Sequence, residues 1–110
     1  MNRKFRLTRS KDFIKIKDAG LSVHHRLLIL AYAENDLGFS RVAVVSSGKI
    51  GNAVTRNRVR RKIKACVNDY WKMIKPGWDL VFYSRVAMVD ADYQTVQNAI
   101  NHLLGKAGVL

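Results

Sequence analysis

The residues of this chain best suited to bind a ligand are closely spaced arginines that follow a loop with two glycines. Residues 48–64 read GKIGNAVTRNRVRRKIK. Guanidinium groups bind two oxygens of a phosphate or two acceptors of a base edge at once, and an asparagine amide both donates and accepts. This pattern predicts a nucleic-acid-binding element, with these candidate residues: Lys49, Gly51, Asn52, Arg56, Asn57, Arg58, Arg60, Arg61 and Lys64.

The two glycines and the helix expected to begin after them also favour binding of an anion, through the backbone. A glycine lets the backbone approach a ligand closely, and the N–H groups of an uncapped first helical turn attract phosphate. The order of residues differs from GxxxxGK[ST], which argues against a nucleotide-hydrolysing loop. Gly48 and Gly51 do match the GxxG of a KH domain, but a KH loop joins two helices, whereas this loop is expected to leave a strand.

The distribution of charge also indicates a polyanionic partner. The 110 residues include 20 Lys and Arg against 8 Asp and Glu, a formal net charge of +12. Seven of the basic residues lie in residues 1–17 and nine in residues 49–75, where Asp69 is the only acid. A face that needs only solvation mixes both signs, so this segregation favours nucleic acid.

A catalytic site made of protein side chains is not expected. Hydrolysis of RNA by a protein needs paired acid–base groups or clustered metal ligands. His24 and His25 are adjacent, so they point to opposite faces of an extended segment, and Asp90 or Asp92 is better explained as a helix cap. The single Cys66 excludes an internal disulfide and a CxxC metal site.

Periodicity predicts one α+β domain over residues 1–110 with the order αββαβα. The apolar content of 48% is sufficient for one packed core. We expect Ser10 to cap the first helix and helices to cover one face of the sheet. The predicted elements are a helix from Ser10 to about Ala19, strands at 27–33, 41–46 and 78–84, a helix from the loop at 47–51 to about Ile74, and a last helix after Asp90 or Asp92.

The helical wheel of the central helix separates a buried stripe from a cationic ridge. At about 100° per residue, one arc holds the apolar residues and Cys66, which we expect to be a buried thiol. Arg58, Arg61, Lys64 and Lys75 fall on the opposite side. Trp71, Trp78, Phe82 and Tyr83 are interpreted as core side chains.

The run from Gly51 to Arg58, GNAVTRNR, resembles the signature of the bacterial ribonuclease P protein subunit family. A basic N-terminus ending in Lys11, Asp12 and Phe13 and the order of the predicted elements extend the resemblance over essentially the whole chain. The resemblance implies a ribosomal protein S5 domain 2-like fold, with a left-handed βαβ crossover through the basic helix. That handedness departs from the general right-handed rule.

The resemblance also implies a function and its partners. In the family, a catalytic RNA subunit uses Mg²⁺ to remove the 5′ leader of precursor tRNA, and the protein binds both RNAs. The basic motif would lie near the RNA subunit, and a cleft between the sheet and the first helix would hold the single-stranded leader. Three residues match that cleft: Lys11, Phe13 and Lys17.

Three positions depart from the family pattern. Lys17 and Ala31 stand where some relatives carry aromatic residues, and Gly48 stands where a lysine is common. Stacking in the cleft should therefore be thinner here and leader affinity more electrostatic. Tyr32 cannot replace the missing aromatic residue, because neighbours in a strand point to opposite faces.

The expected function is that of a protein subunit which assists an RNA-borne endoribonuclease, with Mg²⁺ used mainly through the RNA. Three alternatives stay open at this point: a ribosomal or KH-like RNA-binding module, a self-sufficient nuclease using His24, His25 or His102, and a double-stranded DNA binder. Apolar runs are too short to span a bilayer, so we expect no membrane partner. The resemblance implies a bacterial cytoplasmic location. The sequence leaves open whether the basic segment 1–9 is ordered before RNA binds.

Overall fold

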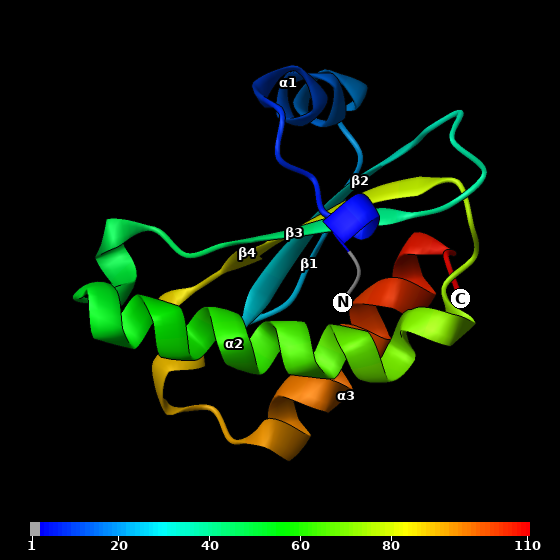
Figure 1. Cartoon of the computed structure of the whole chain (residues 1–110). Coiled ribbons are helices and arrows are strands. Elements are labelled where there is room, and N and C mark those ends of the chain that lie inside the picture. Colours follow the sequence, from blue (N-terminus) through cyan, green and yellow to red (C-terminus); the bar gives the residue numbers. More distant parts are fainter. Residues whose placement is uncertain (1–2) are drawn as a thin grey trace.

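Four strands form one sheet in the computed structural model, which describes residues 3–110 (Figure 1). In the sheet the strands lie in the order β1-β2-β4-β3. Their bounds are β1 (Ser22–His24), β2 (Leu28–Glu34), β3 (Arg41–Val45) and β4 (Trp78–Ser84). The predicted strands are β2, β3 and β4. The additional strand β1, of three residues, is too short to give a periodic signal.

Three α-helices and four short 3₁₀ turns complete the fold. The helices are α1 (Ser10–Ala19), α2 (Ala53–Tyr70) and α3 (Tyr93–Ala107). The 3₁₀ turns are η1 (Arg3–Phe5), η2 (Gly48–Ile50), η3 (Trp71–Met73) and η4 (Val86–Asp90). The order of elements is consistent with the predicted α+β order, with β1 added.

The sheet is mixed. β1 pairs with β2 and β2 pairs with β4 in antiparallel fashion, while β3 and β4 are parallel neighbours. Parallel neighbours require a crossover connection, and α2 provides it. The helix that carries the basic motif is therefore anchored at both ends to hydrogen-bonded strands.

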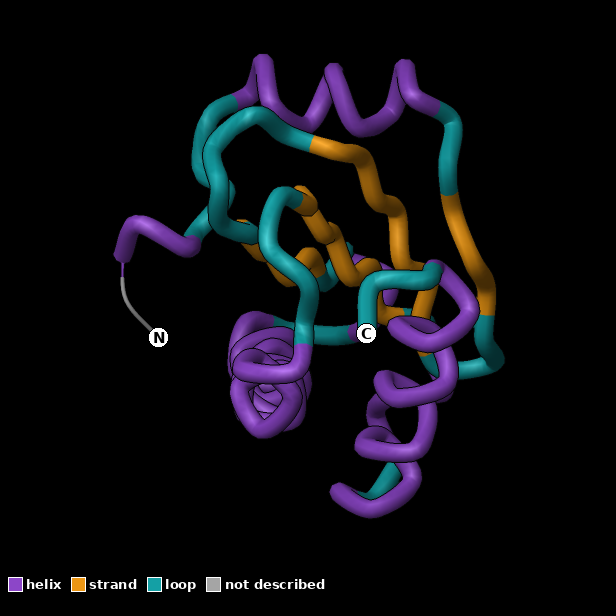
Figure 2. The backbone as a smooth tube through the Cα atoms, turned by 90° about the vertical axis from the view of Figure 1, so that its right-hand side faces the viewer, coloured by secondary structure: helices purple, strands orange, loops and turns teal. Residues whose placement is uncertain are grey.

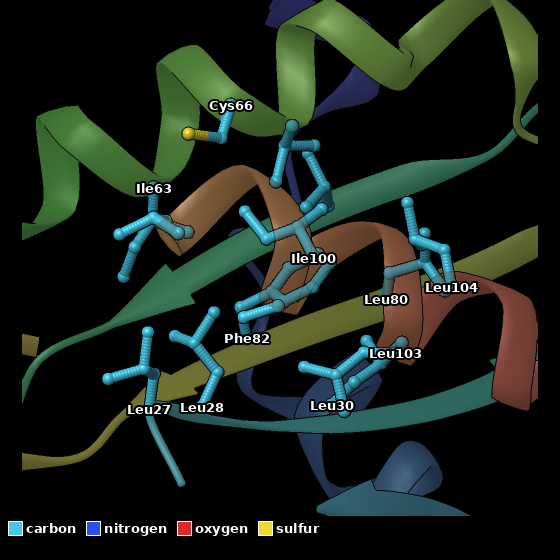
Figure 3. Close-up of a cluster of buried hydrophobic side chains, with 14 of the residues drawn as sticks. Leu27, Leu28, Leu30, Ile63, Cys66, Leu80, Phe82, Ile100, Leu103 and Leu104 are labelled. Carbon is cyan, nitrogen blue, oxygen red and sulfur yellow. The ribbon is translucent and has the colours of Figure 1, made fainter. Parts of the chain in front are cut away.

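The main hydrophobic core lies between the sheet and the pair α2 and α3 (Figure 3). Leu80 and Phe82 of β4 point into it and are fully buried. From α2, the predicted stripe of Val59, Ile63 and Cys66 packs on the same layer. The prediction of a buried thiol is thus confirmed, and burial raises the pKa of Cys66.

The other face of the sheet is covered by α1, so the expectation that helices cover one face only is wrong. Figure 2 shows α1 across one side of the strands, with α2 and α3 on the other. Only four buried residues form the cluster beneath α1: Leu7, Ile16, Ala33 and Val81. The sequence did not reveal this second layer because α1 carries a short apolar stripe of Phe13 and Ile16 amid charged residues.

Two predicted helix caps have different outcomes. Asp92 caps α3, because its carboxylate accepts a hydrogen bond from the N–H of Thr95. Hydrogen bonding with the side chain of Thr95, together with this bond from its N–H, lowers the pKa of Asp92. Ser10 is instead the first residue of α1, and the preceding Arg9 provides no side-chain cap, so the predicted Ser10 cap is wrong.

The basic N-terminal segment is attached to the sheet from Arg6 onward. Arg6 forms a parallel bridge with Val42, and the N–H of Leu7 donates to the carbonyl of Val42 at 3.0 Å. Residues 1 and 2 of the predicted basic segment lie outside the described residues. No helix in residues 3–110 has the length and hydropathy required to cross a membrane.

Candidate nucleic-acid interface

The loop before α2 is closed onto the helix by its own side chains. Gly51 has φ 147°, and a Cβ there would lie 3.2 Å from the Cβ of Thr55. A side chain at this position would be strained and crowded, which accounts for the glycine. Arg56 donates from Nη1 to the carbonyl oxygen of Gly51 at 3.1 Å. This contact holds one guanidinium edge against the loop.

The start of α2 is capped, contrary to the expectation of free N–H groups. The side-chain oxygen of Asn52 accepts from the N–H of Thr55 at 2.9 Å. Asn52 therefore serves first as a helix cap. Its side-chain NH₂ group stays available to donate to a ligand. The sequence signal was present, because asparagine is a preferred capping residue.

Three of the four residues predicted for the ridge lie on α2, but Lys75 does not, because α2 ends at Tyr70 and not near Ile74 as predicted. Arg58, Arg61 and Lys64 are exposed, while Arg60 is half-buried and donates to the side-chain oxygen of Asn57. In residues 3–110 both ion pairs belong to Arg41, so no basic side chain of α2 is neutralised by a carboxylate. Lys49 is exposed on η2, at the end of the same ridge. The ridge is thus a surface of uncompensated positive charge.

A second surface lies under α1, where a hollow of about 400 Å³ separates the helix from the sheet. Lys17 and Ile16 line it from α1, and Ala31 and Tyr83 line it from the sheet. Lys11 is exposed on α1 and is not one of its lining residues. The small side chain of Ala31 leaves the ring of Tyr83 accessible.

Tyr83 is the site residue that the sequence interpretation missed. We expected it in the core with Phe82, but it is 37% exposed and lies on the α1 face. Phe82 is fully buried on the opposite face, as strand alternation requires. The same alternation applied from Phe82 could have placed Tyr83 correctly. Tyr32 packs against the main core, as predicted, with its ring 5.9 Å from that of Trp78.

The two predicted sets of site residues meet at a second hollow, of about 230 Å³. Phe13 of α1 and Lys64 of α2 both line it, together with Arg6 and Val45. The Phe13 side chain is half-buried against the small cluster under α1. The hollow beside Phe13 therefore adjoins the ridge, but it shares no lining residue with the hollow of Lys17 and Tyr83.

A buried ionic network sets the position of α1, and the sequence interpretation did not anticipate it. Arg41 of β3 donates to both oxygens of Asp79 at 2.9 and 2.7 Å and to Asp12 of α1 at 3.2 Å. Asp79 is only 3% exposed and also accepts from the amide of Asn35 at 2.8 Å. The hydrogen bond with Asp79 raises the pKa of Arg41. One guanidinium thus connects α1 to two strands.

The histidines lie at the far end of the sheet from Asp79. The rings of His25 and His102 are 6.0 Å apart, and Nδ1 of His25 accepts from the N–H of Leu27 at 3.0 Å. His24 pairs with Ser22 at 3.2 Å. Within residues 3–110, no three His, Cys, Asp or Glu side chains come together in a way that could hold a metal ion.

Comparison with known proteins identifies relatives over nearly the whole chain. Residues 1–108 match the Ribonuclease P family model. A ribonuclease P protein component of Thermoanaerobacter sp. strain X514 is 38% identical over 107 residues, covering 96% of this chain and 92% of the relative. The protein of the same name from Clostridioides difficile strain 630 is 36% identical over 109 residues, covering 98% and 96%.

Solved structures agree with these relatives. A Staphylococcus aureus RNase P protein mutant, described as defective in mRNA degradation activity, superposes with a TM-score of 0.90 at 28% identity, covering 98% of this chain and 92% of that one. The RNase P protein of Thermotoga maritima superposes with a TM-score of 0.83 at 26% identity, covering 92% and 96%.

Proposed function

Because this chain belongs to the family of ribonuclease P protein components, we propose that its two cationic surfaces bind two different RNAs. The family function is the maturation of tRNA 5′ ends as part of a ribonucleoprotein endoribonuclease. In our proposal the ridge of α2 binds the RNA subunit, and the cleft under α1 binds the 5′ leader of precursor tRNA. An RNA-binding module without a role in cleavage is not favoured, since the family match spans residues 1–108.

The observation that carries this division is the hollow lined by both Phe13 and Lys64. A leader stacked on Phe13 would lie directly beside Lys64 of the ridge, so substrate and RNA subunit would be held next to each other. Both RNAs are polyanions, and the positive charge between them would reduce their mutual repulsion.

On the ridge, we assign phosphate and base-edge contacts to the exposed cations, and loop-shaping roles to Gly51, Asn52 and Arg56. The proposed RNA-binding set is Lys49, Gly51, Asn52, Arg56, Asn57, Arg58, Arg60, Arg61 and Lys64. If about eight phosphates are neutralised, the logarithm of affinity should fall against the logarithm of salt concentration with a slope of roughly −6 to −7. A slope near −1 for the purified protein would contradict this assignment.

In the cleft, the proposed leader contacts are Phe13, Lys17 and Lys11, to which the structure adds Tyr83. Phe13 and Tyr83 offer aromatic surfaces on which unpaired bases stack, and the lysines attract the backbone. Tyr83 supplies an aromatic ring in a cleft whose positions 17 and 31 carry none. Lys17 and Ala31 led us to expect little stacking of leader bases in the cleft. With Tyr83 present, we expect more stacking than those two positions predict.

From the family resemblance, we propose that Mg²⁺ is used mainly through the RNA subunit and is not bound tightly by the protein. Mg²⁺ supplies charge neutralisation and Lewis acidity for phosphodiester hydrolysis. The protein's part is to supply fixed positive charge, so that the RNA needs less of the free ion. The proposed role in tRNA maturation implies a bacterial cytoplasmic location, where the precursor transcripts are made.

The test is precursor-tRNA cleavage at low Mg²⁺ with RNA subunit alone, protein alone, and both together. We expect cleavage only in the combined reaction, and cleavage by RNA alone to appear when Mg²⁺ is raised. Cleavage by the protein alone, or an RNA activity that the protein does not change, would overturn the proposal. Replacing His24, His25 and His102 together should leave the combined activity intact, which separates this function from a histidine-based nuclease.

A further inference from the structure

A third hollow, of about 250 Å³, lies at the open edge of β3, between the N-terminal segment and α2. Its floor is aliphatic and is made by Val42, Val44 and Ala65. Arg6 stands on one side, and Lys64 and Asn68 stand on the other. We call this hollow the edge groove. It shares Lys64 with the basic ridge, and it has no lining residue in common with the hollow under α1.

The backbone of β3 contributes hydrogen-bonding groups to the edge groove. The N–H of Leu7 donates to the carbonyl of Val42, so Val42 directs its backbone groups away from β4. Alternate residues of a strand direct these groups to the same side, so Val44 also presents its N–H and carbonyl outward. In the described part of the chain, Val44 forms no backbone hydrogen bond with a segment outside the sheet. One donor and one acceptor thus face the groove.

This combination of groups suits one nucleotide of a single strand. An aliphatic floor can cover the flat face of a base, and the strand edge and the Asn68 amide can pair with a base edge or a 2′-hydroxyl. Two cations on opposite walls suit the flanking phosphates. The lining contains no carboxylate that would repel them.

The edge groove is also continuous with the proposed leader site. It shares Arg6, Val44 and Lys64 with the hollow beside Phe13. A strand that stacks on Phe13 can therefore pass over the edge of β3 without leaving positive surface. An acidic peptide added to the edge of β3 would satisfy the same backbone groups, but continuity with the Phe13 hollow favours RNA.

We propose that the edge groove binds one nucleotide of the precursor leader, beyond the nucleotides held under α1. This proposal rests on the proposed function, since it needs a leader in the cleft. It predicts that leader affinity continues to rise with leader length after the cleft is filled. The gain ends when the leader is long enough to cross β3.

The steric test is Ala65→Leu, which adds bulk at an exposed position of α2 where leucine is a good helix former. Asn101→Leu, at an exposed position of α3, is the matched control. Affinity of the holoenzyme would be measured by fluorescence anisotropy for substrates with leaders of increasing length. We expect Ala65→Leu to lose roughly fivefold in affinity for long leaders, the low end for a base contact, and nothing for short leaders or mature tRNA. Asn101→Leu should match the unchanged protein throughout.

Equal affinities for Ala65→Leu and the unchanged protein at every leader length would overturn the edge groove. So would a loss that is the same with and without a leader, because it would indicate contact with the RNA subunit. Phe13→Ala keeps the two proposals distinguishable. If it removes leader dependence while Ala65→Leu changes nothing, the edge groove fails and the proposed function stands; if it too has no effect, both fail.

A second experiment identifies the occupant directly. Benzoylphenylalanine in place of the exposed Asn68 would be photoactivated in the assembled holoenzyme with a long-leader substrate. A crosslink to the leader supports the proposal. A crosslink only to the RNA subunit, or only to protein, overturns it and identifies the other occupant.

Discussion

The two faces of the sheet differ in how their covering helices are held. Nineteen buried residues join the sheet to α2 and α3, whereas four lie under α1. On the α1 side, the ionic network of Asp12, Arg41 and Asp79 accompanies the small cluster. A face with little apolar packing leaves surface free for a ligand, and α1 leaves a hollow of about 400 Å³. We call the face covered by α2 and α3 the thick face and the face covered by α1 the thin face. The thick face thus stabilises the protein, and the thin face leaves surface available to RNA.

The largest expected difference between the faces is in the stability lost when a buried isoleucine on each face is changed to alanine. Ile100 of α3 is 0% exposed, and Ile16 of α1 is 2% exposed. We expect Ile100→Ala to lower the free energy of unfolding by about 4 kcal/mol, and Ile16→Ala by about 2 kcal/mol, because α1 can settle into the space. Urea denaturation measures both. Equal losses would show that α1 is as tightly packed as α3.

The ionic network should be the second strongest contribution, through one residue. Arg41→Ala leaves the carboxylate of Asp79 buried with Asn35 as its remaining partner, and should cost about 3 kcal/mol of stability. The matched control is Arg61→Ala on the exposed ridge, which should change stability by less than about 0.5 kcal/mol. Arg61→Ala should weaken binding to the RNA subunit more than Arg41→Ala does. A stable Arg41→Ala protein would contradict the role given to the network.

Binding on the thin face should depend on its two aromatic rings. We expect Phe13→Ala and Tyr83→Ala each to weaken leader binding by about 1–2 kcal/mol, roughly tenfold, because each removes a stacking surface. Affinity for mature tRNA should not change. Tyr83→Phe is the control, since it retains the ring. For each variant, the affinity for a substrate with a leader is divided by the affinity for mature tRNA. If this ratio equals that of the unchanged protein in all three variants, the cleft does not bind the leader.

The smallest expected effect concerns pH and His25, at the end of the sheet near α3. Burial, with help from His102 and Arg26, lowers the pKa of His25 below 6.5. The unfolded chain therefore takes up a proton at a higher pH than the folded chain does. Stability should be constant above this range and should fall as the pH is lowered through 6.5 toward the folded pKa.

This pH dependence can be tested by urea denaturation at pH 7.5 and 5.5. His102→Gln removes one of the charges that disfavour protonated His25, so the fall in stability should be shallower in this variant. His24→Gln is the control, because His24 is paired with Ser22 and is not in contact with the His25 ring in the described contacts. A steeper fall in His102→Gln would contradict the assignment.

Much of the thick face could be predicted from the sequence, because its signals are local and repeated. The stripe of α2 and the β-branched strand β3 follow from spacing and residue type alone, and the cap of α3 was narrowed to Asp90 or Asp92. The thin face could not be predicted in the same way. Its network joins Asp12 to Arg41 and Asp79, which are far apart in the sequence, and no periodicity relates them.

The site shows the same division. The basic motif was recognisable as a run of residues, and the structure exposes Arg58, Arg61 and Lys64 while leaving Arg56 and Arg60 half-buried. Tyr83 and the edge groove depend instead on which strand lies at the edge and which residue faces α1. Those facts belong to the strand order β1-β2-β4-β3, which a single sequence does not specify.

The crossover through α2 has a mechanical consequence for assembly. Its 18 residues span about 27 Å, and both ends lead into strands that are hydrogen-bonded to each other. Its buried stripe packs on the same sheet, so a tilt or slide of α2 would disturb the main core. The row of guanidinium groups is therefore a rigid template, and the loss of conformational freedom on docking falls on the flexible polynucleotide.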